Sequence, residues 1–99
     1  MDKYLRVIED ISRMKIHSST KAVFKALDIL TDIVLESENI NTLIESYSKI
    51  ACNLVKSRPA SALMSNTIRN FTLRINNLLQ RGGLDLVKDR AVKESEELK

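Results

Sequence analysis

The chain has 99 residues, of which 43% are hydrophobic and 29% are charged, a balance typical of one globular domain. It contains only 2 glycines and 1 proline, and this scarcity of turn residues disfavours an all-β fold. The sequence lacks both the run of roughly 20 apolar residues that a transmembrane helix needs and the hydrophobic start of a signal peptide. We therefore expect an all-α, cytoplasmic protein without a membrane partner.

Hydrophobic residues recur at the three-and-four spacing of helices almost from end to end. The second segment has the widest apolar face, which places it at the centre of a bundle. The chain is interpreted as one helical domain, 1–99, with about five helices. These helices are expected over residues 2–15, 19–36, 41–57, 61–81 and 84–98.

Several polar residues and glycines mark where these helices begin and end. Asn41, or a capping box of Thr42 and Glu45, is expected to cap the third helix, and Ser61 or Ser65 the fourth. Gly82-Gly83 is expected to end the fourth helix, because glycine adopts the left-handed conformation at little cost. The charged fifth segment has a thin apolar stripe, so it must dock on the bundle or on a partner.

The sequence carries few groups suited to catalysis. It lacks a glycine-rich phosphate loop, the HExxH metal pattern and the GxSxG nucleophile pattern. The single Cys52 and single His17 exclude an internal disulfide and a structural zinc site, and Cys52 is interpreted as a small helix-filling residue. We expect no complete active site, no metal and no cofactor.

Two breaks between predicted helices are suited to bind a phosphate. His17, Ser18 and Ser19 precede the second helix, whose free amides can hold an anion. Arg58 precedes Pro59 and offers a fork of donors. Surface or capping roles for His17, and pairing of Arg58 with the last carbonyls of the third helix, remain open alternatives.

The sequence argues against nucleic acid as a partner, although the net charge is +3. Arg69, Arg74 and Arg81 lie along the predicted fourth helix with asparagines between them. However, basic and acidic residues are interleaved through most of the chain, which is typical of solvated helix faces. An aromatic content of 4% also offers little surface for stacking bases.

Two motifs occur in an order known from one protein family. The first is IEDISRMKI at 8–16, and the second is SRPASAL at 57–63 followed by NTIR at 66–69. In this order the sequence resembles the N-terminal helical domain of the family that unites translation initiation factor 2B alpha, beta and delta subunits with ribose-1,5-bisphosphate isomerase and methylthioribose-1-phosphate isomerase. The resemblance implies a fragment of a longer protein, in which an α/β domain follows; a short complete chain remains the alternative.

The resemblance also implies roles for individual residues, with departures from the family pattern. Arg58 matches the arginine that helps to hold the sugar phosphate in the isomerases, whereas His17 stands at the position of a second such arginine. Ser18 and Ser19 replace the glycine and alanine that follow it. His17 lacks the bidentate fork of arginine, so we expect weaker phosphate binding.

These departures favour the translation-factor branch over the isomerases. The leading hypothesis is an interaction or scaffold domain that binds its own C-terminal α/β domain and protein subunits of an initiation-factor assembly. The first alternative is the substrate-capping domain of a ribose-1,5-bisphosphate isomerase-like enzyme, with a sugar phosphate as ligand. The second is a free-standing helical adaptor whose grooves take a partner helix.

Overall fold

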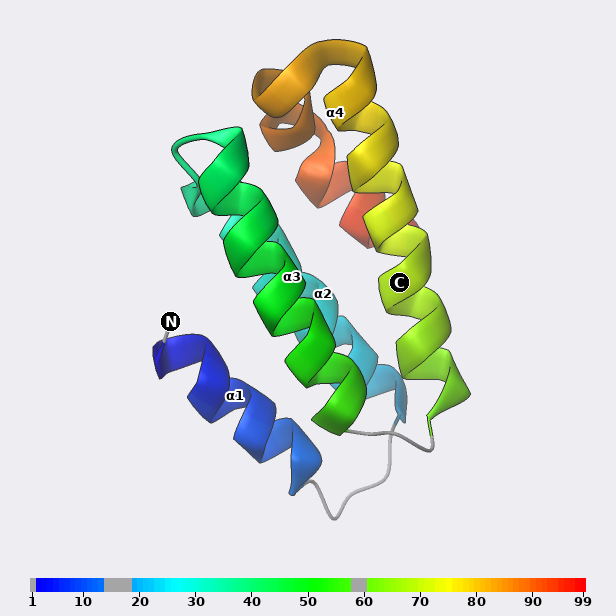
Figure 1. Ribbon diagram of the computed structural model, residues 1–99. Coiled ribbons are helices and arrows are strands. Elements are labelled where there is room, and N and C mark those ends of the chain that lie inside the picture. Colours follow the sequence, from blue (N-terminus) through cyan, green and yellow to red (C-terminus); the bar gives the residue numbers. More distant parts are fainter. Residues whose placement is uncertain (1, 14–18, 58–60) are drawn as a thin grey trace.

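A computed structural model describes residues 2–13, 19–57 and 61–99, and these residues form helices and their connections without any strand. The predicted all-α class is therefore confirmed for this part of the chain (Figure 1). None of the described helices combines the length and the apolar character needed to cross a bilayer. The elements are α1 (Asp2–Ser12), α2 (Ser19–Glu36), α3 (Ile40–Ser57) and α4 (Ala62–Glu97).

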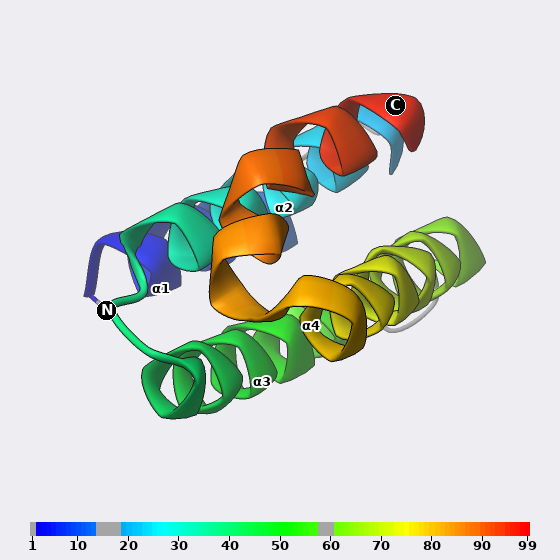
Figure 2. The ribbon, with the colours of Figure 1, turned by 90° about the horizontal axis from the view of Figure 1, so that it is seen from above.

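Four helical elements stand where five are predicted, because the expected helices 61–81 and 84–98 are both present but run together as α4, with a break in helical geometry between them. Gly83 is the one residue inside α4 that leaves helical geometry, with φ 73° and ψ −161°. The chain reverses there, and the C-terminal half of α4 returns alongside α2 (Figure 2). The glycine pair therefore separates the two helical halves of α4, at the boundary that the sequence predicts.

Local hydrogen bonds fix the starts of α3 and α4. The amide of Thr42 donates to Asn39 Oδ1 at 2.8 Å, so the expected cap at Asn41 is wrong and α3 begins one residue earlier than predicted. The amide of Met64 donates to Ser61 Oγ at 3.1 Å, which confirms Ser61 as the cap of α4. α1 ends at Ser12, and residues 14 and 15 of the first expected helix lie outside the described residues.

α2 is the central helix of the molecule, as its wide apolar face predicts. It spans the expected residues 19–36 and contacts α1, α3 and α4, whereas α1 does not contact α4 within the described part. Leu27, Leu30 and Val34 of α2 are completely buried. The core thus surrounds α2, and α1 lies on its periphery against α2 and α3 (Figure 1).

Ion pairs connect segments that the reversal brings together. Arg74 Nη1 lies 2.6 Å from Glu94 Oε2 and 2.7 Å from Glu97 Oε2, so the two halves of α4 are joined across the bend. Lys99 Nζ lies 2.6 Å from Asp28 Oδ1 and joins the end of the chain to α2. Because partly exposed pairs contribute only about 0–1 kcal/mol each, their main effect is to align the helices that the core already packs.

We predict that Gly83→Ala destabilises the fold by about 1–3 kcal/mol, because the backbone region it occupies is almost restricted to glycine. An added methyl group meets no neighbouring atom within 4 Å, so the loss reports backbone strain alone. Urea unfolding measures it. The control is Gln80→Ala, an exposed helical position expected to stay within about 0.5 kcal/mol of wild type. Equal stability of Gly83→Ala and wild type would contradict the assigned geometry.

Candidate functional site

The residues that the sequence predicts to bind phosphate fall mostly outside the described part. His17, Ser18 and Arg58 lie in the segments 14–18 and 58–60, which are not described. Ser19 is the first residue of α2. The helix ends that flank both segments lie at the same end of the molecule (Figure 1). The phosphate site therefore stays a prediction, and the described residues provide other surface features.

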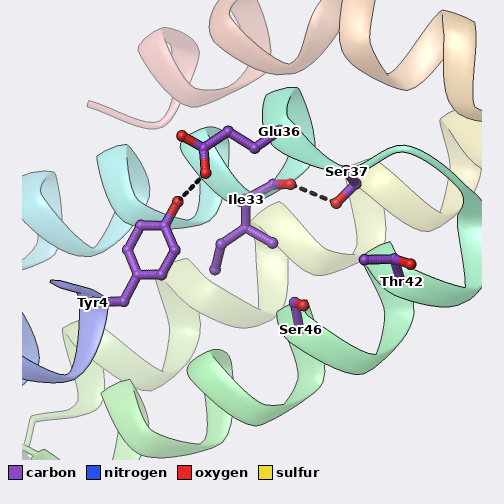
Figure 3. A pocket seen from close by; sticks show the side chains of 6 residues that line it. All are labelled: Tyr4, Ile33, Glu36, Ser37, Thr42 and Ser46. Carbon is purple, nitrogen blue, oxygen red and sulfur yellow. Dashed lines mark hydrogen bonds between the residues drawn. The ribbon is translucent and has the colours of Figure 1, made fainter. Parts of the chain in front are cut away.

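The first feature is a polar hollow between α1, α2 and α3 with a volume of about 200 Å³ (Figure 3). Tyr4 OH donates to Glu36 Oε2 at 2.8 Å and closes one side of the hollow. Ser37 Oγ donates to the carbonyl of Ile33 at 2.6 Å, which satisfies a buried hydroxyl just after the end of α2. The described lining residues are Tyr4, Ile33, Glu36, Ser37, Thr42 and Ser46.

This polar hollow is suited to hydrogen bonding rather than to nucleophilic chemistry. Its described side chains supply one carboxylate and several hydroxyls, whereas activation of a hydroxyl requires an adjacent base that is positioned against it. Sequence reasoning missed the hollow, because Tyr4 and Glu36 are 32 residues apart and each fits the polar or apolar pattern of its own helix. The clearest role of this region is structural, because the Tyr4–Glu36 hydrogen bond beside the hollow holds α1 on α2.

The second feature is an apolar stripe on α3, formed by Ile40 and Ile44. These residues are 43% and 52% exposed, and they lie one helical turn apart on the same side of α3. The buried Tyr47 borders the stripe. Its hydroxyl lies 2.8 Å from Thr72 Oγ1, and its ring stacks on Phe71 with centroids 6.4 Å apart. These contacts hold α3 firmly against α4 beside the exposed stripe.

The remaining groups with chemical potential are dispersed. Cys52 is exposed on α3 and is absent from the described lining of the polar hollow. Histidine, cysteine, aspartate and glutamate side chains do not gather into any metal-binding group within residues 2–13, 19–57 and 61–99. Arg74 forms ion pairs with Glu94 and Glu97. One of the three arginines expected along this helix is therefore already paired within the chain. This pairing weakens the case for a nucleic-acid surface on α4.

Comparison of the chain with protein-family models, with curated proteins and with solved structures finds no match. The resemblance to the initiation factor 2B and isomerase family therefore rests on the two sequence motifs alone.

Burial raises the pKa of Tyr47 to about 12, and the hydrogen bond with Thr72 opposes this shift in part. An unfolded tyrosine titrates at about pH 10. The folded state therefore retains a proton that the unfolded state loses between these values. Tyr47 thus contributes stability that is fully present below about pH 10 and is lost as the pH rises towards 12.

We predict that the tyrosinate absorbance of Tyr47 appears only near pH 12, in step with unfolding. The variant Tyr4→Phe leaves Tyr47 as the single tyrosine, so an ultraviolet titration with parallel circular dichroism measures this group alone. Tyr47→Phe is the matched control, and its stability should vary less with pH above about pH 10. Titration of Tyr47 near pH 10 in a folded chain would contradict its burial against Phe71.

Proposed function

We propose that this chain is a helical interaction domain of a protein similar to translation initiation factor 2B, and that it acts by binding other protein subunits. The observation that carries the proposal is the exposed apolar stripe of Ile40 and Ile44 on α3. Adjacent exposed apolar residues are typical of surfaces that bind proteins. The translation-factor assignment is supported by the two motifs at 8–16 and 57–69.

The surroundings of the stripe favour binding without rearrangement. The Asn39 cap fixes the first turn of α3, where Ile40 lies. Tyr47 anchors the next turns through Phe71 and Thr72. A partner therefore meets a preorganised helix face, and less conformational entropy is lost on association than with a mobile segment.

We predict that Ile44→Lys weakens binding of this chain to initiation factor 2 or to the other initiation factor 2B subunits by about tenfold or more, because a charge would be buried in an apolar contact. Isothermal titration calorimetry with the purified proteins measures the affinity. Leu73→Lys is the matched control, since Leu73 is 60% exposed but lies on α4 rather than on α3. Unchanged affinity of Ile44→Lys, or no binding by the wild-type chain, would refute the proposal.

A second candidate function is the substrate-capping domain of a sugar-phosphate isomerase. It is supported by the position of the helix ends around the segments 14–18 and 58–60, since the N-termini of α2 and α4 lie at the same end of the molecule (Figure 1). Free amides at helix N-termini favour anions. Arg58, between α3 and α4, would add a bidentate donor to such a site.

For this candidate we predict that ribose 1,5-bisphosphate shifts the amide resonances of residues 17–19 and 58–60. Arg58→Ala should abolish both the shifts and any isomerase activity, because the bidentate phosphate contact is lost. Arg81→Ala serves as the control, since Arg81 is an exposed arginine on α4. An absence of shifts at millimolar ligand would leave the interaction domain as the better account.

A further inference from the structure

The first half of α4 has a surface whose composition differs from that of the rest of the chain. Residues 62–81 contain three arginines but no lysine, aspartate or glutamate, although 29% of the whole chain is charged. The exposed positions of this segment carry five carboxamides, which define the amide face of α4. They are Asn66, Asn70, Asn76, Asn77 and Gln80.

Two arginines of this segment have no counter-charge. Arg69 and Arg81 are exposed, and neither makes an ion pair with any residue that the structure describes. Arg74, by contrast, is held by the C-terminal half of α4. The amide face therefore presents positive charge alone, and a guanidinium is suited to bind a carboxylate through two parallel hydrogen bonds.

Acidic side chains gather elsewhere on the molecule. Asp28, Asp32 and Glu96 line a hollow of about 230 Å³ between α2 and the C-terminal half of α4. Lys99 Nζ lies 2.6 Å from Asp28 Oδ1 and 3.3 Å from Glu96 Oε1, so the chain supplies a cation to this acidic surface itself. It supplies no carboxylate to the amide face within the described part. Charge complementarity therefore points to an acidic partner there.

An apolar side chain lies among the carboxamides. Leu73 is 60% exposed, the largest exposed fraction among the large hydrophobic residues that the structure describes. Arg69 precedes it by one helical turn, and Asn77 follows it by one turn, so both lie on the same side of α4. Depletion of lysine, aspartate and glutamate around exposed apolar and arginine side chains is typical of protein–protein interfaces. The amide face thus has the composition of a surface that another protein covers.

The spacing along this face indicates what shape of partner it fits. Exposed residues recur at alternate intervals of four and three, as in the seam along which one helix packs against another. They are Ala62, Asn66, Arg69, Leu73, Asn76 and Gln80. At 1.5 Å per residue this seam is about 27 Å long, enough for several turns of a second helix.

We infer that the amide face of α4 binds an acidic amphipathic helix of a partner protein. Carboxylates of that helix pair with Arg69 and Arg81, and an aliphatic side chain packs on Leu73. The carboxamides both donate and accept hydrogen bonds, so they can satisfy polar groups around these contacts. Nucleic acid fits less well, because its binding depends on several phosphate contacts, whereas the face offers two unpaired cations beside a leucine. The inference is independent of the proposed interaction through Ile40 and Ile44.

The test is a titration of the isotope-labelled chain with a synthetic helical peptide of about 20 residues. In this peptide leucines repeat at alternate intervals of four and three, and glutamates flank them. The matched control peptide has glutamine in place of each glutamate. We expect saturable shifts of the amide resonances of 66–81 with the acidic peptide, and an affinity at least about tenfold lower with the neutral one. An absence of saturable shifts in the millimolar range, or equal affinity for both peptides, would overturn the inference.

Two other occupants of the amide face are tested in the same experiment. A mixed-sequence DNA duplex that binds more tightly than the acidic peptide would assign the face to nucleic acid and overturn the inference. Shifts of the resonances of 66–81 on raising the concentration of the chain alone would mean that a second copy covers the face, which would also overturn it.

Two variants connect binding to individual side chains. Arg69→Glu should weaken binding of the acidic peptide about tenfold or more, because attraction becomes repulsion, whereas Arg90→Glu, at an exposed position in the C-terminal half of α4, should leave it unchanged. Leu73→Asn should also weaken binding, while Ile44→Asn on α3 should not. Circular dichroism checks that each variant is folded. Unchanged affinity in both Arg69→Glu and Leu73→Asn would overturn the inference.

Discussion

The reversal of α4 at Gly83 is the constraint on which the rest of the structure depends. Because the backbone there adopts φ 73°, the C-terminal half of α4 returns along α2, and Val87 and Ala91 become completely buried. α2 can carry an apolar face too wide for a surface helix only because it is covered from this side as well as by α1 and α3. The same reversal brings Arg74 to Glu94 and Glu97.

The surfaces follow from this packing of the helices. α1 is peripheral and joins α2 through Tyr4 and Glu36, beside a polar hollow. α3 meets α4 through Tyr47 and leaves an apolar stripe outside that contact. The return of α4 along α2 creates the third surface, with carboxylates and an unsatisfied hydroxyl. The three differ in chemistry because different helices build them.

The sequence predicts local features of this fold better than tertiary ones. The all-α class, the bounds of α2, the Ser61 cap and the place of the reversal depend on residue types within a few positions of one another. Asn39 and Asn41 are both of a residue type that caps helices well, so the nearby sequence does not decide which of them begins α3. In the structure the cap is Asn39. Contacts such as Tyr4 with Glu36 are set by helix packing, so neither residue stands out from its own pattern. His17, Ser18 and Arg58, which are expected to bind phosphate, fall outside the described residues. The phosphate site therefore stays a prediction.

The C-terminal half of α4 shows why an interleaved charge pattern is not uniform once it is folded. Along the sequence, 93–99 suggests one solvated helix face. In the structure, Glu94 and Glu97 turn to Arg74 and hold the two halves of α4 together, whereas Glu96 turns to α2 and lies beside Asp28 and Lys99. Ser95, between them in sequence, is buried. Glu94 and Glu97 thus stabilise the bend of α4, whereas Glu96 lines the hollow between α2 and α4. Acidic residues that look equivalent in the sequence therefore have different roles in the fold.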